Sequence, residues 1–217
     1  MPNYDAVIFD LDGTLLGTLA DLADSMNHVL ERRGLPPHAL AAYKRFVGDG
    51  IENLVLRALP EEMRTQDTIA GCLVEMRSEY GRRWADKTRP YDGIPALLDA
   101  LVARGLKLAV LSNKPNDFTQ LTVARLLPVW RFEAVVGLRA GAPRKPDPSS
   151  ALQIVDALAL PPQRFLYVGD TDTDMKTARA AGMYAVGALW GFRTAAELSA
   201  NGAQSLIGRP EELLELL

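Results

Sequence analysis

Near its amino end the 217-residue chain reads AVIFDLDGT at positions 6–14. The first four residues are apolar and mostly β-prone, which is typical of a strand buried on both faces of a parallel sheet. Two aspartates, Asp10 and Asp12, follow at once. Functional residues of open parallel sheets lie just past the carboxyl ends of the strands. The segment therefore predicts a central strand with acidic chemistry at its end.

Short apolar runs of the same kind recur further along the chain, each bounded by glycine, proline or polar residues. They lie at 108–111, 134–136, 165–168 and 184–186. Helical patterns separate them, and residues 115–127 open with proline and then keep a helical period. Alternation of this kind predicts an α/β fold, a Rossmann-like parallel sheet core with crossover helices.

Between Thr18 and Lys87 the pattern changes, because no strand-like run appears and apolar residues recur at helical spacing. One apolar stripe contains Leu19, Leu22, Met26, Val29 and Leu30. The sequence GLPP at 34–37 ends that helix. We therefore expect residues 17–87 to form a helical insertion in an α/β domain made of residues 1–16 and 88–217.

Composition narrows the class of protein. The chain is 48% hydrophobic and 24% charged with a formal net charge of −3, which is ordinary for a globular protein of one or two domains. No block of basic residues favours nucleic acid, and no apolar run is long enough to span a membrane. The single Cys72 is expected to be a small buried helical residue. A cytoplasmic location is expected, because a lone cysteine suits a reducing compartment and the first residues do not resemble a secretory signal.

Polar residues follow the other predicted strands too. The second strand runs into Ser112-Asn113-Lys114, and the fourth runs into GDTDTD at 169–174. A loop with the sequence RKPDP occupies 144–148. Carboxylates that converge at one sheet edge need a cation, and Mg²⁺ suits oxygen ligands together with phosphate. Lys145 and Ser112 supply positive charge and a hydrogen bond for a phosphoryl group.

These motifs resemble, in order, the four motifs of the haloacid dehalogenase-like superfamily: DLDGT at 10–14, LSN at 111–113, KPDP at 145–148 and GDxxxD at 169–174. The resemblance implies that Asp10 is a nucleophile that becomes transiently phosphorylated. It implies that Asp12 donates a proton to the leaving oxygen and afterwards activates the water that splits the aspartyl phosphate.

The same resemblance implies the remaining roles. The Mg²⁺ ligands are expected to be Asp10, the backbone carbonyl of Asp12 and the side chain of Asp170, with Asp174 just behind them. The phosphate-binding set is Gly13, Thr14, Ser112, Asn113 and Lys145, with Gly13 and Asn113 acting through backbone amides and Thr14 also supporting Asp12. A bland alternative stays open for Asp172, which is equally well explained as an acid in the first turn of a helix.

The insertion is similar to the α-helical cap that follows the first motif in phosphoglycolate phosphatase-like members, notably through FVGDGI at 46–51 and YDGI at 91–94. One departure is Gly17-Thr18, where many members carry an acid before the hydroxyl residue, and this puts hinge behaviour or substrate choice at the insertion in doubt. The two histidines, His28 and His38, lie in the insertion without companions and are expected to be structural or surface residues.

The motifs and the resemblance together predict that the protein is a Mg²⁺-dependent phosphatase acting on a small phosphorylated metabolite. The resemblance to phosphoglycolate phosphatase-like members makes 2-phosphoglycolate the first candidate substrate. Alternatives are other small phosphomonoesters such as sugar phosphates, pyrophosphate, and a phosphomutase, which also keeps the acid at position 12. From another class, a phospho-aspartate signalling receiver shares the aspartate, hydroxyl and lysine, but it is about half this length and lacks the insertion. A phosphate binder without catalytic activity is a third alternative. The sequence does not indicate an oligomeric state.

Overall fold

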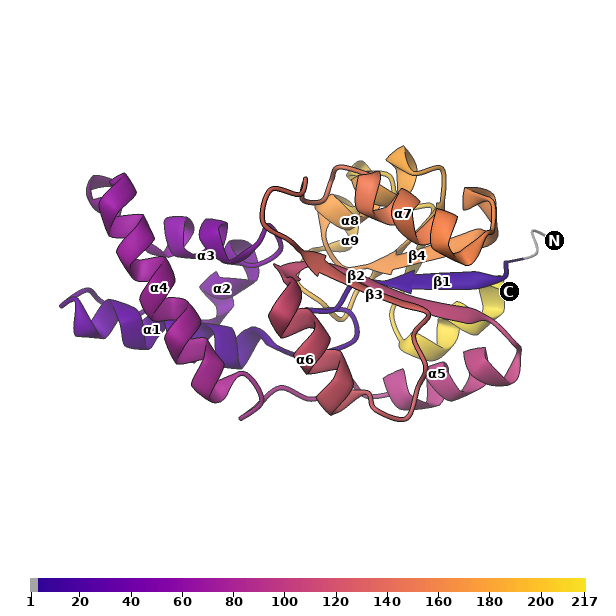
Figure 1. Ribbon diagram of the computed structural model, residues 1–217, viewed down its shortest axis with the longest axis horizontal. Coiled ribbons are helices and arrows are strands. Elements are labelled where there is room, and N and C mark those ends of the chain that lie inside the picture. The colour runs from indigo at the N-terminus through magenta and orange to yellow at the C-terminus, as the bar shows by residue number, and fades with distance from the viewer. Residues whose placement is uncertain (1–3) are drawn as a thin grey trace. The chain divides into compact units, whose positions relative to one another are not determined.

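The computed structural model describes residues 4–217 (Figure 1). The chain divides into two compact units, one formed by the chain up to Leu16 together with Pro90–Leu217 and the other by Gly17–Arg89. The first unit contains a six-stranded parallel sheet, and the second unit is helical. The α/β fold class predicted from the sequence is confirmed.

The sheet has the strand order β3-β2-β1-β4-β5-β6. Its strands are β1 (Ala6–Phe9), β2 (Lys107–Pro115), β3 (Ala134–Leu138), β4 (Phe165–Gly169), β5 (Tyr184–Ala188) and β6 (Ser205–Ile207). All five predicted strands are present. The sixth, β6, is not among them, since it has only three residues and two of these are half-buried. The sheet register is regular around β1, which pairs with β2 and β4 along its whole length.

Helices cover both faces of this sheet (Figure 1). They are α5 (Ile94–Ala103), α6 (Asn116–Leu126), α7 (Ser149–Leu158), α8 (Asp172–Ala180) and α9 (Ala195–Ala200), with 3₁₀ turns η2 (Pro162–Arg164) and η3 (Pro210–Leu216). Alternate residues of β1 serve the two cores: Val7 and Phe9 pack with α5, whereas Ala6 and Ile8 pack with α7 and α8. Burial on both faces is why these strands read as continuous apolar runs.

The helical unit contains α1 (Leu19–Arg32), α2 (Leu40–Phe46), α3 (Ile51–Ala58), η1 (Glu61–Met63) and α4 (Gln66–Arg83). The predicted stripe of α1 is buried except for Leu19, which is half-buried. Cys72 is buried in α4, as expected. His38 contacts the carbonyl of Ala58 at 2.8 Å, which is the structural role that the sequence favours.

The first and the last residues of the helical unit are hydrogen-bonded to each other. The amide of Gly17 donates to the carbonyl of Arg89 over 2.9 Å. The buried carboxylate of Asp21 accepts hydrogen bonds from the amides of Lys87 and Thr88 and from the Thr88 hydroxyl. These contacts tie the start of α1 to the end of the unit. Among residues 4–217, none of the helices is both long and apolar enough to cross a membrane.

Candidate active site

The carboxyl ends of the three central strands bring the predicted residues together. Asp10 follows β1, Ser112 lies in the last part of β2, and Asp170 follows β4. Because β1 pairs in parallel with both β2 and β4, these three positions meet at one edge of the sheet. All three side chains are buried.

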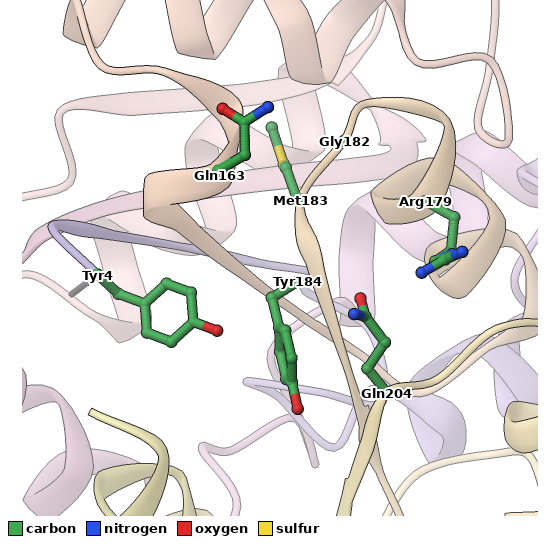
Figure 2. A pocket seen from close by; sticks show the side chains of 7 residues that line it. All are labelled: Tyr4, Gln163, Arg179, Gly182, Met183, Tyr184 and Gln204. Atoms are coloured by element: carbon green, nitrogen blue, oxygen red, sulfur yellow. The ribbon is translucent and has the colours of Figure 1, made fainter. Parts of the chain in front are cut away.

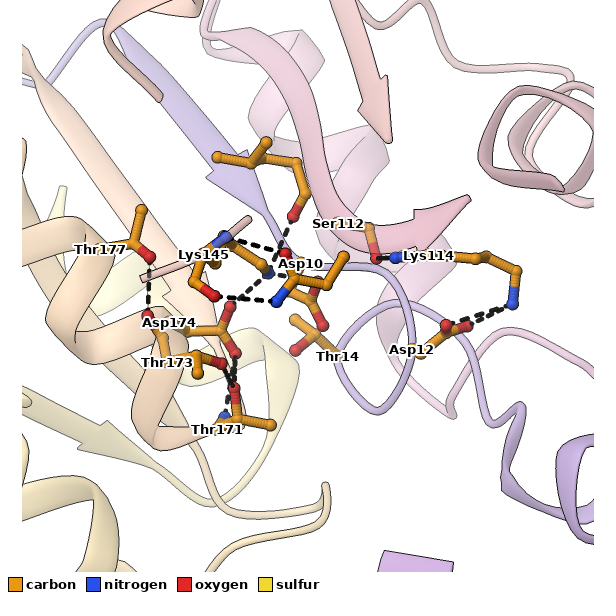
Figure 3. Close-up of polar contacts among 12 residues, drawn as sticks. Asp10, Asp12, Thr14, Ser112, Lys114, Lys145, Thr171, Thr173, Asp174 and Thr177 are labelled. Atoms are coloured by element: carbon orange, nitrogen blue, oxygen red, sulfur yellow. Dashed lines mark hydrogen bonds and ion pairs between the residues drawn. The ribbon is translucent and has the colours of Figure 1, made fainter. Parts of the chain in front are cut away.

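Lys145 lies between two of the carboxylates. Its ammonium is 2.7 Å from Asp10 Oδ1 and 2.6 Å from Asp174 Oδ1, and it also donates to the carbonyl of Leu111. Burial alone lowers the pKa of Lys145, but the carboxylates of Asp10 and Asp174 hold it well above its usual range. The lysine is therefore a fixed positive charge beside Asp10 (Figure 3).

The side chain of Asn113 positions the backbone that carries this lysine. Its Oδ1 accepts a hydrogen bond from the amide of Lys145 at 2.9 Å, and its Nδ2 donates to the carbonyl of the same residue at 3.2 Å. This two-point contact is not among the predicted roles of Asn113, for which the sequence indicated only a backbone amide. The paired amide and carbonyl hold the loop at 144–148 against the end of β2.

Asp170 is held by two donors from distant parts of the chain. The hydroxyl of Thr14 donates to its Oδ1 at 2.9 Å, and the amide of Phe192 donates to its Oδ2 at 2.8 Å. The sequence led us to expect that Thr14 supports Asp12, whereas in the structure its hydroxyl contacts Asp170. Burial and the nearby carboxylates of Asp10 and Asp174 raise the pKa of Asp170 well above its usual range.

Asp174 belongs to the first turn of α8 and completes an acidic cluster. Carboxylate oxygens of Asp10, Asp170 and Asp174 all lie within 4.8 Å of one another. The second oxygen of Asp174 accepts from the amide and the hydroxyl of Thr171, which is the N-cap of α8. Asp172, in the same turn, pairs with Lys176 at the surface instead, which agrees with the bland interpretation of that residue.

The charge balance of this cluster indicates that it accommodates a cation. Three buried carboxylates face the single ammonium of Lys145, and burial raises the pKa of Asp10 to about 7 even though Lys145 acts in the opposite direction. A divalent ion among oxygen ligands would remove the cost of ionising these groups. The residues present therefore fit a divalent ion such as Mg²⁺, which the carboxylates of Asp10, Asp170 and Asp174 could hold.

Asp12 points away from the acidic cluster (Figure 3). Both of its carboxylate oxygens accept from the ammonium of Lys114, at 3.0 and 3.1 Å. Lys114 belongs to the polar run Ser112-Asn113-Lys114, but it is not among the site residues predicted from the sequence. Its signal in the sequence is a charged residue inside the polar run that ends an otherwise apolar strand. Ser112 lies close by, where its hydroxyl accepts a hydrogen bond from the amide of Lys114.

A separate hollow of about 360 Å³ lies at the opposite edge of the sheet, where β4, β5 and β6 begin (Figure 2). Its lining comprises Tyr4, Gln163, Arg179, Gly182, Met183, Tyr184 and Gln204. It contains neither the acidic cluster nor Lys145. We therefore place the candidate active site at the carboxyl ends of the strands, where the acidic cluster and Lys145 lie.

Gly13 gives the first test of this geometry. A methyl group built at Gly13 would lie 2.3 Å from Asp170 Oδ2, and its φ of +97° is unfavourable for any other residue. We expect Gly13→Ala to displace Asp170 and to raise the Mg²⁺ concentration for half-maximal activity at least about tenfold, as loss of a supporting contact does in metal sites.

Gly105→Ala is the matched control, because Gly105 has a φ of +78° and a methyl group there would meet nothing within 4 Å. It shares the backbone strain without touching Asp170. Titration of activity with Mg²⁺ for both variants makes the comparison. An unchanged Mg²⁺ requirement in Gly13→Ala would show that the position of Asp170 does not govern metal binding.

The fold and the site define an α/β protein of parallel-sheet type with a buried cluster of three carboxylates that could hold a metal ion at the sheet edge. A sequence model described as haloacid dehalogenase-like hydrolase matches residues 7–188. The chain belongs to this family.

Individual relatives narrow the resemblance within the family. The chain is 31% identical over 212 residues to a phosphoglycolate phosphatase of Aquifex aeolicus, covering 97% of this chain and 95% of the relative. It is 37% identical over 197 residues to a phosphoglycolate phosphatase of Rhodospirillum rubrum, covering 86% and 80%. A crystal structure from Lactobacillus delbrueckii subsp. bulgaricus superposes with a TM-score of 0.92 at 33% identity, covering 99% of this chain and 98% of that one.

Proposed function

We propose that the protein is a Mg²⁺-dependent phosphomonoesterase that acts through an aspartyl phosphate on Asp10, with 2-phosphoglycolate as its first substrate. The observation that carries the proposal is the position of Asp10, buried at the sheet edge against Lys145 and facing Asp170 and Asp174. Relatives named phosphoglycolate phosphatase along nearly the whole chain support the substrate.

Asp10 provides the nucleophilic oxygen. Lys145 binds its Oδ1, which leaves Oδ2 to attack phosphorus. The leaving alkoxide takes a proton from Asp12, and Asp12 later accepts a proton from the water that hydrolyses the aspartyl phosphate. When bound, Mg²⁺ neutralises the carboxylates and the phosphate oxygens. In this scheme Lys145, the hydroxyl of Ser112 and the backbone amide of Asn113 bind the transferred phosphoryl group. The backbone amide of Gly13, which the sequence also assigned to the phosphate, donates to the carbonyl of Leu16 over 2.9 Å in the structure and is therefore left out of this set.

Alternatives within the family remain other small phosphomonoesters, pyrophosphate and a phosphomutase. The names of the relatives favour hydrolysis over a mutase or a signalling receiver. We assign residues 17–87 as the cap in this scheme. The cytoplasmic location stays a prediction.

Turnover of 2-phosphoglycolate, beside a panel of sugar phosphates and pyrophosphate, tests the function. We expect 2-phosphoglycolate to give the highest kcat/KM, and we expect excess chelator to remove the activity and added Mg²⁺ to restore it. A protein that hydrolyses none of these compounds in the presence of Mg²⁺, or that is fully active in chelator, is not this enzyme.

Asp170→Asn tests the metal site. An amide retains the acceptor for Thr14 or Phe192 but removes a charged oxygen ligand, so the Mg²⁺ concentration for half-maximal activity is expected to rise at least about tenfold. Asp172→Asn is the control, because that acid pairs with Lys176 outside the cluster. Equal Mg²⁺ requirements in the two variants would remove Asp170 from the ligand set.

A further inference from the structure

Lys114 and Lys145 are the two buried lysines of the described chain, and only Lys145 has a part in binding phosphate. The side chain of Lys114 is 3% exposed and makes a two-point ion pair with Asp12. Burying an ammonium is costly unless an anion compensates it, and here that anion is the residue that the mechanism needs for proton transfer. The pair therefore links a buried charge to the catalytic acid.

The ion pair occupies both oxygens of Asp12. To deliver a proton to the leaving oxygen, Asp12 needs one oxygen directed at that atom within hydrogen-bond reach. The arrangement in the structure directs both oxygens at Lys114 instead. Release of at least one of them is favoured when another anion takes its place beside Lys114, because a compensating anion lowers the cost of burying the ammonium.

The substrate carries such an anion. This step rests on the proposed function, in which the leaving group is glycolate. Its carboxylate is separated from the leaving oxygen by a single CH₂ group, so the cation that binds the carboxylate must lie beside the group that protonates that oxygen. Lys114 meets this requirement, since its ammonium is 3.0 Å from Asp12. Lys145 does not, because its ammonium contacts the nucleophile Asp10 and Asp174 rather than Asp12.

We propose that Lys114 is the specificity-determining residue that recognises the carboxylate of the substrate, and that it exchanges Asp12 for that carboxylate when the substrate binds. The exchange leaves one ammonium and one carboxylate paired before and after. It frees Asp12 to turn to the leaving oxygen. Substrates without a carboxylate next to the ester do not induce the exchange. With these substrates Asp12 protonates the leaving oxygen less efficiently.

The test compares 2-phosphoglycolate with ethyl phosphate, which has the same two-carbon chain and an alkoxide leaving group but lacks the carboxylate. The quantity measured is the ratio of their kcat/KM values in the presence of saturating Mg²⁺. We expect Lys114→Met to lower this ratio by about 10- to 100-fold, the range for loss of a hydrogen bond to a charged group. Lys114→Arg keeps the charge and is expected to recover part of the ratio.

Lys107→Met is the matched control, because Lys107 begins the same strand and contacts the carbonyl of Leu158 at the opposite sheet edge. It is expected to leave the ratio unchanged. A parallel loss with both substrates in Lys114→Met would mean that Lys114 only positions Asp12, and this overturns the proposal, as does an unchanged ratio. Failure of the proposed function is distinguishable, because the unaltered enzyme would then not turn over 2-phosphoglycolate at all.

Discussion

Asp10→Asn is expected to lower phosphomonoester turnover by more than about 10,000-fold, because an amide of nearly the same shape is a poor nucleophile. The structure makes this a specific test. Asp10 lies against Lys145 with one oxygen at 2.7 Å, and the amide oxygen of asparagine can accept the same hydrogen bond. The loss should therefore appear in kcat, and binding of inorganic phosphate should change far less.

The stability of the same variant provides an independent readout. Burial raises the pKa of Asp10 to about 7 in the folded protein, above the value of an exposed aspartate. A raised carboxyl pKa means that the free energy of unfolding falls as the pH rises from the unfolded pKa to the folded one. Asparagine cannot ionise, so at pH 8 without metal the variant is expected to unfold at a temperature no lower than the native protein.

Asp99→Asn is the control for the chemical change itself. Asp99 is exposed on α5, where it accepts a hydrogen bond from the indole of Trp130. It is expected to retain native turnover. If Asp10→Asn kept even a tenth of the native rate while Asp99→Asn behaved normally, Asp10 would have no part in the mechanism.

The fold could be predicted because local pattern and global position agree in the core. The run 6–9 is apolar at every residue since β1 is buried on both faces, and the polar residues of each following loop mark where a strand ends. The strand β6 lacks that agreement. It lies at the sheet edge with two half-buried residues, so it has no continuous apolar run to distinguish it from a loop.

The sequence motifs predict which residues belong to the site, but they do not predict the hydrogen-bond partners of those residues. Asp10, Lys145 and Asp170 meet because adjacent parallel strands bring their ends together. The partners that hold Asp170 could not be predicted, since the amide of Phe192 is a backbone donor with no sequence signature and the hydroxyl of Thr14 is equally able to reach other acceptors. Side-chain direction depends on tertiary packing rather than on spacing in the chain.

The position of Lys114 also could not be predicted from the sequence. It is visible in the sequence as part of Ser112-Asn113-Lys114, but a lysine at a strand end is equally compatible with a solvated surface position. Only the distance of 3.0 Å to Asp12, together with burial of the ammonium, distinguishes the two interpretations. The role of this lysine follows from the three-dimensional structure.

Asp12→Asn is expected to affect the two chemical steps differently. With an alkyl phosphate the leaving alkoxide needs a proton, so phosphorylation of Asp10 should slow by about 100- to 10,000-fold, the range for loss of general acid–base catalysis. With nitrophenyl phosphate the leaving nitrophenolate does not need that proton, so the rate of phosphorylation of Asp10 should be nearly that of the native enzyme. Hydrolysis of the aspartyl phosphate still lacks its base, and the phosphorylated enzyme should accumulate.

Single-turnover measurements with both esters, following phosphate release and the phosphorylated protein separately, decide between the roles of Asp12. Its backbone carbonyl is unchanged by the substitution, so any contribution to metal binding through that atom persists in the variant. Lys114 loses Asp12 as its anionic partner, but this loss is common to ethyl phosphate and nitrophenyl phosphate, neither of which has a carboxylate, and it cancels when these two esters are compared. Equal slowing with both esters and no accumulated intermediate would therefore contradict proton transfer by Asp12 and leave it only the role of shaping the metal site through its backbone.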